Sequence, residues 1–270
     1  MSAVDRPVPN LPSRAPSIRS EHGEAFEEGA EHYDLVRPGY PEAAVGFLLG
    51  GVPGARGAGL DVVDLGAGTG ILTAQLVERG AVATAVDPSA DMLRALHAKL
   101  PAVACARAGA EATGLPSASC DVVVCAQAWH WVDPDAATAE ALRLLRPAAA
   151  GRRPALGLVW NQLDVTVPWV HRLARIMHAG DVHRPEFEPP KGAGLGPWAR
   201  HEEHWAQAAT PGFLIELAKS RAYYLRATEQ TRARVVANLR WYLHEHLGYG
   251  ADEHLELPYF THAWRAEATG

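Results

Sequence analysis

The sequence predicts an α/β fold in which helices cover both faces of a doubly wound, mostly parallel β-sheet. Between residues 61 and 161, short apolar runs of strand length alternate with segments of helical period. The first run ends in a turn with three glycines, and polar residues follow several of the later runs. This alternation predicts parallel strands joined by helices, and the glycine turn marks one such connection.

The composition favours one large domain and argues against several classes of partner. The 270 residues carry 25 basic and 31 acidic side chains, a formal net charge of −6. Because the arginines are scattered, the basic patch that nucleic-acid binding needs is missing, and no nucleic acid partner is expected. No apolar run reaches membrane-spanning length, and no charged-then-apolar pattern opens the chain. We expect a cytoplasmic protein without a membrane partner.

Neither the cysteines nor the histidines predict a metal site. The three cysteines lie in or beside apolar runs without C-x-x-C spacing, so we expect free, buried thiols at Cys105, Cys120 and Cys125. The segment 201–205 reads H-E-E-H-W, but the zinc motif H-E-x-x-H places its histidines at i and i+4. Here the spacing is i and i+3, and we expect a strand at this position instead.

The segment before the first strand divides in two. Residues 1–20 are rich in Pro, Ser and Arg with few large apolar groups, and they predict a disordered tail. Residues 21–270 then form the single domain. Prolines at positions 38 and 41 separate a helix-compatible segment from a second helix over residues 42–49.

The stretch from Asp61 to Gly70, D-V-V-D-L-G-A-G-T-G, predicts a strand, a tight turn and a helix start. Glycines let the chain turn sharply and let a ligand approach a backbone that has no Cβ. The N–H groups at a helix start favour polar or anionic groups, so the stretch predicts a nucleotide-like ligand. Dinucleotide-binding folds use G-x-G-x-x-G, with the third glycine one position later than here.

The pattern D-x-G-x-G-x-G in this stretch resembles the first motif of the class I S-adenosylmethionine (SAM)-dependent methyltransferases. The resemblance implies a Rossmann-like sheet, for which the apolar runs supply seven strands with an antiparallel last strand. It also implies that the turn lies beside the methionine and ribose parts of SAM, at Asp64, Gly66, Ala67 and Gly68. A nicotinamide or flavin ligand and a plain strand-to-helix turn are the alternatives.

A second resemblance precedes the glycine turn. From Tyr33 to Pro41 the chain reads Y-x-x-x-R-P-x-Y-P, similar to the N-terminal lid of small-molecule methyltransferases of the trans-aconitate and ubiquinone type. It implies a lid over residues 21–49, with Tyr33 and Arg37 over the methionine end of SAM and Tyr40 near the acceptor. Alternatively, the tyrosines are packing aromatics and Arg37 caps a helix.

The second predicted strand, residues 81–86, ends at Asp87. A carboxylate at the tip of the strand beside the glycine turn can accept hydrogen bonds from both ribose hydroxyls, which makes Asp87, with Pro88 after it, a predicted cofactor residue. Ser89 is a suitable N-cap for the following helix. Met92 matches the position where the family often lays an apolar side chain against adenine, and core packing is the alternative.

Residues 102–106 predict a third strand, and the loop from Ala108 to Pro116 resembles the family's G-D-A-E-x-L-P segment, which holds the adenine edge. Gly109 stands where the family has Asp, so a side-chain acceptor for the adenine amino group is absent. Adenine recognition would then come from the backbone of Ala110 and Glu111, or from elsewhere.

The fourth predicted strand, residues 120–125, is followed by A-Q-A-W-H-W-V-D. Ligands in open α/β sheets bind outside the carboxyl ends of the strands, so Ala126 and Gln127 are expected near the sulfonium. His130 is the candidate general base because its free pKa lies near neutrality, and packing of the loop is the alternative. The aromatic candidates for the acceptor cavity, which are equally candidates for the core, are Trp129, Trp131, Trp160 and Trp205.

Apolar periods predict the remaining elements. These are helices over residues 136–145, 168–178, 211–218 and 228–246, and strands over residues 155–161, 201–205 and 255–264. The last strand contains a proline and is expected at or near the sheet edge. Residues 181–200 lack a clear period, and we expect a substrate-side insertion over about 162–220. Past residue 161 the resemblance is limited to short pieces at 210–211, 220–221 and 257–259.

Together these observations predict metal-free, SAM-dependent methyl transfer to an oxygen or nitrogen of a small-molecule acceptor in specialised metabolism, with S-adenosyl-L-homocysteine (SAH) as product. Positioning the acceptor in line with the S–CH₃ bond can lower the barrier by about 7–11 kcal/mol, so a base is optional. The alternatives are a non-catalytic SAM-binding or scaffold protein and an NAD-dependent oxidoreductase, which the glycine spacing disfavours. Assembly as a homodimer stays open.

Overall fold

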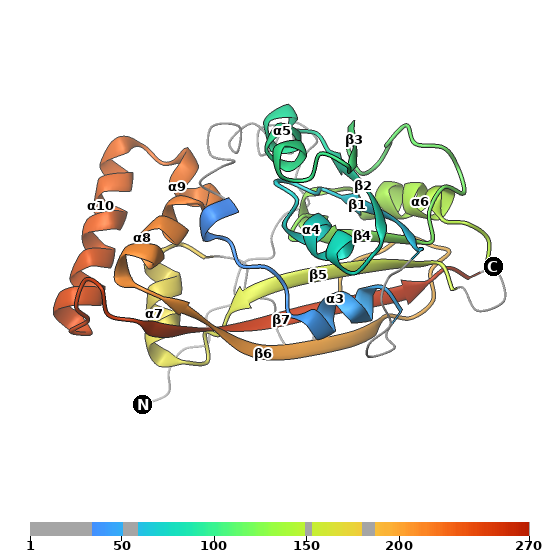
Figure 1. Ribbon diagram of the computed structural model, residues 1–270. Coiled ribbons are helices and arrows are strands. Elements are labelled where there is room, and N and C mark those ends of the chain that lie inside the picture. The colour runs from blue at the N-terminus through green and yellow to red at the C-terminus, as the bar shows by residue number, and fades with distance from the viewer. Residues whose placement is uncertain (1–33, 51–58, 149–152, 180–186, 270) are drawn as a thin grey trace.

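The computed structural model describes residues 34–50, 59–148, 153–179 and 187–269. Its strands are β1 (Asp61–Leu65), β2 (Val82–Asp87), β3 (Ala104–Arg107), β4 (Val122–Ala126), β5 (Ala155–Leu163), β6 (Ala199–Ala209) and β7 (Leu255–Glu267). They form a seven-stranded sheet in the order β3-β2-β1-β4-β5-β7-β6, drawn in Figure 1. The predicted α/β class and the seven strands are confirmed.

The parallel half of the sheet has its topological switch at β1. β2 pairs with one side of β1 and β4 with the other, and β3 and β5 continue outward, all parallel. Ligands in such sheets bind outside the carboxyl ends of the strands at the switch point. The glycine turn after β1, Asp87 at the end of β2 and Gln127 after β4 therefore lie along the same edge of the sheet.

β7 turns the sheet from parallel to antiparallel. It lies between β5 and β6 and runs antiparallel to both, which confirms the predicted antiparallel direction of the last strand. β6 forms the edge of the sheet beside it. β6 spans 11 residues, more than the predicted five. Pro258 in β7 has no N–H to donate, and its carbonyl oxygen accepts the backbone N–H of Asp164 at 2.9 Å.

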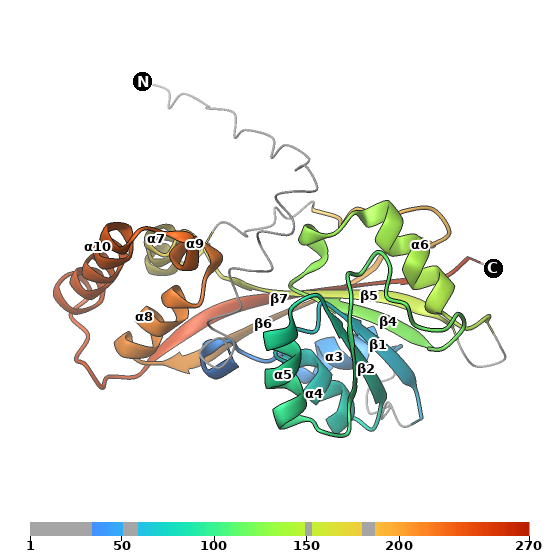
Figure 2. The same ribbon diagram turned by 90° about the horizontal axis from the view of Figure 1, so that it is seen from above.

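Helices cover both faces of the parallel half, as Figure 2 shows. On one face lie α3 (Glu42–Leu48), α4 (Ile71–Glu78) and α5 (Ala90–Lys99), and on the other lies α6 (Pro134–Leu144). Successive strand residues point to opposite faces. Val62 and Val122 consequently pack with α3 and α4, whereas Val63 and Val123 pack with α6.

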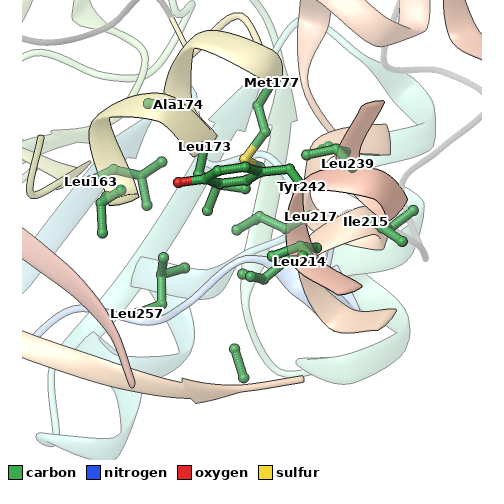
Figure 3. Close-up of a cluster of buried hydrophobic side chains, with 14 of the residues drawn as sticks. Leu163, Leu173, Ala174, Met177, Leu214, Ile215, Leu217, Leu239, Tyr242 and Leu257 are labelled. Carbon is green, nitrogen blue, oxygen red and sulfur yellow. The ribbon is translucent and has the colours of Figure 1, made fainter. Parts of the chain in front are cut away.

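A group of helices, the helical cap, covers the carboxyl end of β5 and the start of β7 (Figure 1). It consists of α7 (Pro168–Ile176), α8 (Pro211–Lys219), α9 (Ala222–Arg226) and α10 (Glu229–Arg240), with a π-helical turn at Trp241–His246. Figure 3 shows its apolar core, in which Leu173 and Met177 from α7 meet Leu214 and Tyr242. The Tyr242 hydroxyl donates to the Trp169 carbonyl oxygen at 2.9 Å. Of these helices, α9 was not predicted from the sequence.

The expected substrate-side insertion over residues 162–220 stays a prediction. This range contains β6, a full strand of the main sheet, together with α7 and α8 of the cap. The strand predicted at residues 201–205 is the middle of β6, whose residues from 200 to 208 alternate between exposed and half-buried. The predicted tail over residues 1–20 and residues 21–33 of the predicted lid lie outside the described residues.

The cysteine prediction is correct in part. All three are free thiols, and Cys120 and Cys125 are buried, but Cys105 is exposed because β3 is an edge strand. Burial raises the pKa of the Cys120 thiol to about 12 and that of Cys125 further, so both stay protonated. Within the described ranges, no helix combines the length and apolar character needed to cross a bilayer.

Candidate active site

The glycine turn after β1 is folded back onto β2. The backbone N–H groups of Gly66 and Ala67 both donate to the Val86 carbonyl oxygen, at 2.8 and 3.1 Å. At Gly66 φ is +68°, and an added Cβ would lie 2.6 Å from the Ala128 Cβ. At Gly70 φ is +84°, and a Cβ would lie 2.7 Å from Leu96 Cγ. Both glycines are therefore required by packing as well as by backbone conformation.

Gly68 differs from its two neighbours in the motif. Its φ is +55°, and a Cβ built on it meets no described atom within 4 Å. Its N–H donates to Asp87 Oδ2 at 2.9 Å. The middle glycine thus opens onto free space next to Asp87, where a ligand can approach the backbone.

The carboxyl group of Asp87 is oriented by two backbone donors. Oδ2 accepts from Gly68, and Oδ1 accepts from the Ser89 N–H at 2.8 Å. The side chain is 8% exposed, and burial raises its pKa although the two N–H groups oppose the rise. Each oxygen keeps a lone pair, so the group can accept two further hydrogen bonds, as the ribose prediction requires.

Asp64 lies beneath the turn and is completely buried. Its Oδ2 accepts a hydrogen bond from Thr73 Oγ1 at 2.6 Å, which joins β1 to α4. Among the described residues Oδ1 has no partner. Burial raises the pKa of this carboxyl to about 7, opposed by the Thr73 hydrogen bond and assisted by the charge of Asp87. The structure shows Asp64 bracing the turn, and direct contact with a cofactor stays a prediction.

The segment before α3 lies over the glycine turn. Asp34 Oδ1 accepts hydrogen bonds from Thr69 Oγ1 at 2.9 Å and from Lys99 Nζ at 2.5 Å. Thr69 belongs to the turn itself and is 1% exposed. This anchorage fits a lid over the turn, although Tyr33 lies outside the described residues. Asp34 was not predicted from the sequence, because a lone acidic residue between two predicted helices carries no specific signal.

At the end of β4, Gln127 adopts an unusual backbone conformation with φ of +57°. Its N–H still donates to the Val159 carbonyl oxygen at 2.9 Å, and its side-chain Nε2 donates to the Asn161 carbonyl oxygen at 3.0 Å. A non-glycine residue held in the left-handed region costs roughly 1–3 kcal/mol and marks functional sites. Gln127 was predicted near the sulfonium, and its strained backbone agrees with a position at the site.

A polar network fixes the neighbouring part of β5. Trp205 Nε1 donates to Thr261 Oγ1 at 2.8 Å, and the Thr261 hydroxyl donates to Asn161 Oδ1 at 2.6 Å. Asn161 Nδ2 in turn donates to the Gly39 carbonyl oxygen at 2.9 Å. Four segments far apart in sequence thereby meet at Asn161: β6, β7, β5 and the segment before α3.

A pocket opens at the carboxyl ends of β4 and β5, beside the helical cap. We call it the β4–β5 pocket, and it is lined by Arg37, Gln127, Asn161, Gln162, Leu163, Ala174, Ala179, Arg221 and Tyr259. The Arg37 side chain is directed by Ser220, to which its Nε and Nη2 donate at 3.1 and 3.3 Å. Arg37 and Gln127 were predicted as site residues from the sequence, whereas Arg221 and Tyr259 were not. The available signal for these two was the faint resemblance to the methyltransferase family at residues 220–221 and 257–259.

A second hollow lies at the opposite edge of the sheet, among Asp61, Val82, Thr84 and Pro116. It faces the amino ends of β1 and β2, away from the glycine turn, Asp87 and Gln127. Ligand sites in open α/β sheets lie at the carboxyl ends. The β4–β5 pocket is accordingly the candidate for the acceptor.

Comparison with known proteins decides the family. The family model described as "Methyltransferase domain" matches residues 63–150. An uncharacterized methyltransferase of Mycobacterium tuberculosis is 40% identical over 243 residues, which cover 90% of this chain and 95% of that protein. The chain belongs to the class I SAM-dependent methyltransferases.

Two further relatives of the methyltransferase agree with this assignment. A ubiquinone biosynthesis O-methyltransferase of Xanthomonas oryzae pv. oryzae is 29% identical over 182 residues, 64% of this chain and 73% of that protein. The solved structure of a proposed type II methyltransferase from Anaeromyxobacter dehalogenans has a TM-score of 0.55 and 28% identity, covering 85% of this chain and 97% of that one. The predicted family is confirmed.

The predicted adenine side of the methyltransferase is formed by buried and hydrogen-bonded groups. Met92 on the first turn of α5 is 6% exposed, and Ala110 is 8% exposed within the core beneath α6. Glu111 Oε1 accepts the Asp133 N–H at 2.9 Å, and the Pro88 carbonyl oxygen accepts from Arg107 Nε at 3.1 Å. Their contacts with adenine stay a prediction.

The structure of the methyltransferase supports the core alternative for two of the candidate tryptophans. Trp129 and Trp160 are 2% and 1% exposed within the core between the sheet and α6, and neither lines the β4–β5 pocket. Trp205 lies behind the pocket wall, stacked on Tyr259 with ring centroids 4.8 Å apart. Tyr40 is also buried, and its backbone N–H and carbonyl bind the Gln75 side chain. The sequence alone does not show whether an aromatic side chain lies in the core or in the wall of a cavity.

His130 is exposed and stands outside the β4–β5 pocket lining. Its Nδ1 accepts a hydrogen bond from Trp160 Nε1 at 3.4 Å, and its ring packs on Trp131 at 4.5 Å. Because Nδ1 accepts this hydrogen bond, the neutral ring carries its hydrogen on Nε2, and the nitrogen that could take a proton is the one engaged by Trp160. The packing interpretation has direct support in these contacts, and the general-base role stays a prediction.

The rejected zinc motif is explained by the strand that contains it. Residues at i and i+3 of a strand point to opposite faces of the sheet. His201 accordingly stacks on Phe47 at 5.5 Å, whereas His204 packs on Phe260 at 4.1 Å. The described part of the chain contains no cluster of three or more side chains suited to hold a metal ion.

Protonation of Asp64 makes the stability of the methyltransferase depend on pH. The pKa of Asp64 is raised above that of an unfolded Asp. Its contribution to the free energy of unfolding is therefore fully present below about pH 4 and is lost as pH rises toward 7. Replacing it by Asn should remove this trend. We expect the difference in free energy of unfolding between wild type and Asp64→Asn to change by about 2–4 kcal/mol from pH 4 to 7.

The measurement is urea unfolding at a series of pH values. Asp252→Asn, a change at an exposed carboxylate, is the matched control and should leave the wild-type trend unaltered. A difference between wild type and Asp64→Asn that stays constant over this range would contradict the assignment.

Gly68→Ala should separate binding from folding. The new Cβ enters open space, and the positive φ costs an Ala about 1–2 kcal/mol, so the protein should fold with a slightly lower melting temperature. Binding of SAH, measured by calorimetry, should weaken at least tenfold because the Cβ occupies the approach to the backbone. Gly248→Ala, at φ of +80° with equally open surroundings, should show the same stability loss with unchanged SAH affinity. Equal affinities in the two variants would refute this role of Gly68.

Proposed function

We propose that the methyltransferase transfers the methyl group of SAM to an oxygen or nitrogen of a small-molecule acceptor bound in the β4–β5 pocket. The observation that supports this most strongly is the position of two adjoining regions on one sheet edge. The open turn at Gly68 with the oriented carboxylate of Asp87 forms the first, and the pocket forms the second. Gln127 at the end of β4 stands between them.

The residues around Gly68 fit the nucleoside part of SAM. Asp87 would accept the ribose hydroxyls through the lone pairs left on its two oxygens, and the backbone at Ala67 and Gly68 would lie against the cofactor. Arg37 would meet the methionine carboxylate, since a guanidinium binds carboxylates through paired donors. When bound, SAM supplies an electrophilic methyl group and is released as SAH.

The protein's own contribution at the pocket is orientation. The Gln127 amide is held by Asn161, which is itself held by Thr261 and by the segment before α3. Such fixed amide groups can accept hydrogen bonds from a hydroxyl or amine acceptor and orient its lone pair. Positioning alone is worth about 7–11 kcal/mol, so this proposal needs no base in the pocket.

Size and charge favour a small acceptor. Ala174 and Ala179 from the α7 region approach the pocket on one side, and the cap closes that end of the sheet. The formal net charge of −6 disfavours a nucleic acid. The O-methyltransferase name of the Xanthomonas relative supports oxygen as the acceptor atom. The proposal leaves assembly as a homodimer open.

Asp87→Ala tests the cofactor assignment. SAH at about 100 times its dissociation constant should raise the melting temperature of the wild type by about 5–10 °C. The variant should lose this shift because the acceptor oxygens for the ribose are gone, while Asp252→Ala, far from the turn, should retain it. Circular dichroism of the ligand-free variant verifies that it folds. A melting shift with NADH but none with SAH would contradict the assignment.

Methyl transfer itself is tested with SAM labelled with carbon-13 in the methyl group. The enzyme is incubated with panels of small hydroxyl and amine compounds, and the carbon chemical shift separates O-methyl from N-methyl products. We expect a product in one of these panels and no incorporation into RNA or DNA. Tight SAM binding with no product in either panel would favour the non-catalytic alternative.

A further inference from the structure

The hydroxyl group of Tyr259 is an unsatisfied polar group at the wall of the β4–β5 pocket. The side chain is 4% exposed, and among the described residues its hydroxyl oxygen is buried without a hydrogen-bond partner. Burying a hydroxyl without a partner is unfavourable, and buried tyrosines normally find one. A hydroxyl kept unsatisfied beside a pocket indicates that a ligand supplies the partner.

The ring that carries this hydroxyl is held in place. Tyr259 stacks on Trp205 with an interplanar angle of 13°, and Trp205 is fixed by its hydrogen bond to Thr261. The backbone of Tyr259 lies between Leu163 of β5 and Trp205 of β6 in the sheet register. The hydroxyl therefore has a defined position, as a specificity group requires.

Two guanidinium groups face the same pocket. Arg37 and Arg221 both line it, and the charges of both act on the Tyr259 hydroxyl. They lower the pKa of Tyr259, but burial outweighs them and raises it to about 12. The phenol accordingly stays protonated at neutral pH and acts as a hydrogen-bond donor. Arg221 is the N-cap residue of α9, so the helical cap contributes this side chain to the pocket that Leu163 of β5 also lines.

We infer that the acceptor carries a carboxylate, and that Arg221 and the Tyr259 hydroxyl bind it in the β4–β5 pocket. A guanidinium pairs with both oxygens of a carboxylate, and the phenol adds a third donor. Leu163, Ala174 and Ala179 form an apolar wall beside these donors, which suits a short hydrocarbon part next to the carboxylate. The inference rests on the proposed function, since it concerns the small acceptor of that same pocket.

The test uses simple probes on the full chain saturated with SAH. Propionate, its neutral counterpart propionamide and inorganic phosphate are titrated and followed by NMR. We expect propionate to bind at least tenfold more tightly than propionamide and more tightly than phosphate. Arg221→Gln should remove the preference for propionate over propionamide, and Tyr259→Phe should weaken propionate binding about fivefold.

Matched controls lie on α9. Arg226→Gln and Tyr223→Phe alter exposed side chains outside the pocket lining and should bind propionate like the wild type. Tyr259→Phe should also raise the melting temperature of the ligand-free protein by about 2–4 °C, because it removes an unsatisfied hydroxyl. A residue with a merely structural role would not combine higher stability with weaker propionate binding.

The outcomes separate this inference from the proposed function. SAH affinity should be unchanged in all four variants. Equal binding of propionate and propionamide by the wild type, tighter binding of phosphate, or wild-type selectivity in both pocket variants would overturn the inference while SAH binding stands. Loss of SAH binding by the wild type, with the preference for propionate retained, would instead overturn the methyl-transfer assignment and leave the anion site supported.

Discussion

The hydrogen bond from the Gly68 N–H to the Asp87 carboxylate is the interaction on which the cofactor half of the site depends. It joins the turn after β1 to the tip of β2, and it requires the positive φ that glycine adopts without strain. The other oxygen of Asp87 accepts from Ser89, the N-cap of α5. One carboxylate thus orients both the turn that leads into α4 and the first turn of α5, around an open space between them.

The acceptor half is built differently, because side chains rather than backbone groups form it. Asn161 connects β5 with Thr261 of β7 and with the segment before α3, and its backbone carbonyl holds Gln127. Antiparallel pairing of β7 next to β5 is what brings Thr261 opposite Asn161. The helical cap adds Arg221 and the apolar wall. This half therefore depends on pairing between elements about 100 residues apart, such as Asn161 and Thr261.

The sequence predicts the parts of the structure that depend on local signals better than the parts that depend on contacts between distant elements. Period and turn chemistry are local signals, so the strands, the glycine turn and Asp87 at the tip of β2 were predicted correctly. β6 was found only in part because polar residues such as His201, Glu203 and Gln207 occupy its half-buried positions, so its sequence lacks an apolar alternation. For Trp129 and Trp160 both cavity and core stayed open, because residue type does not encode whether an aromatic ring faces the core. Arg221 and Tyr259 were missed because only the tertiary fold brings them together.

The two regions also differ in what folding requires of single positions. At Gly66 and Gly70 any side chain would collide with a neighbour, so packing leaves no alternative residue there. At Tyr259 the hydroxyl has no described partner within the protein, and losing it would relieve an unsatisfied group. Folding thus preserves the glycine turn regardless of function, whereas folding alone would favour Phe at position 259. The proposed carboxylate ligand would offset this cost by giving the buried hydroxyl a hydrogen-bond partner.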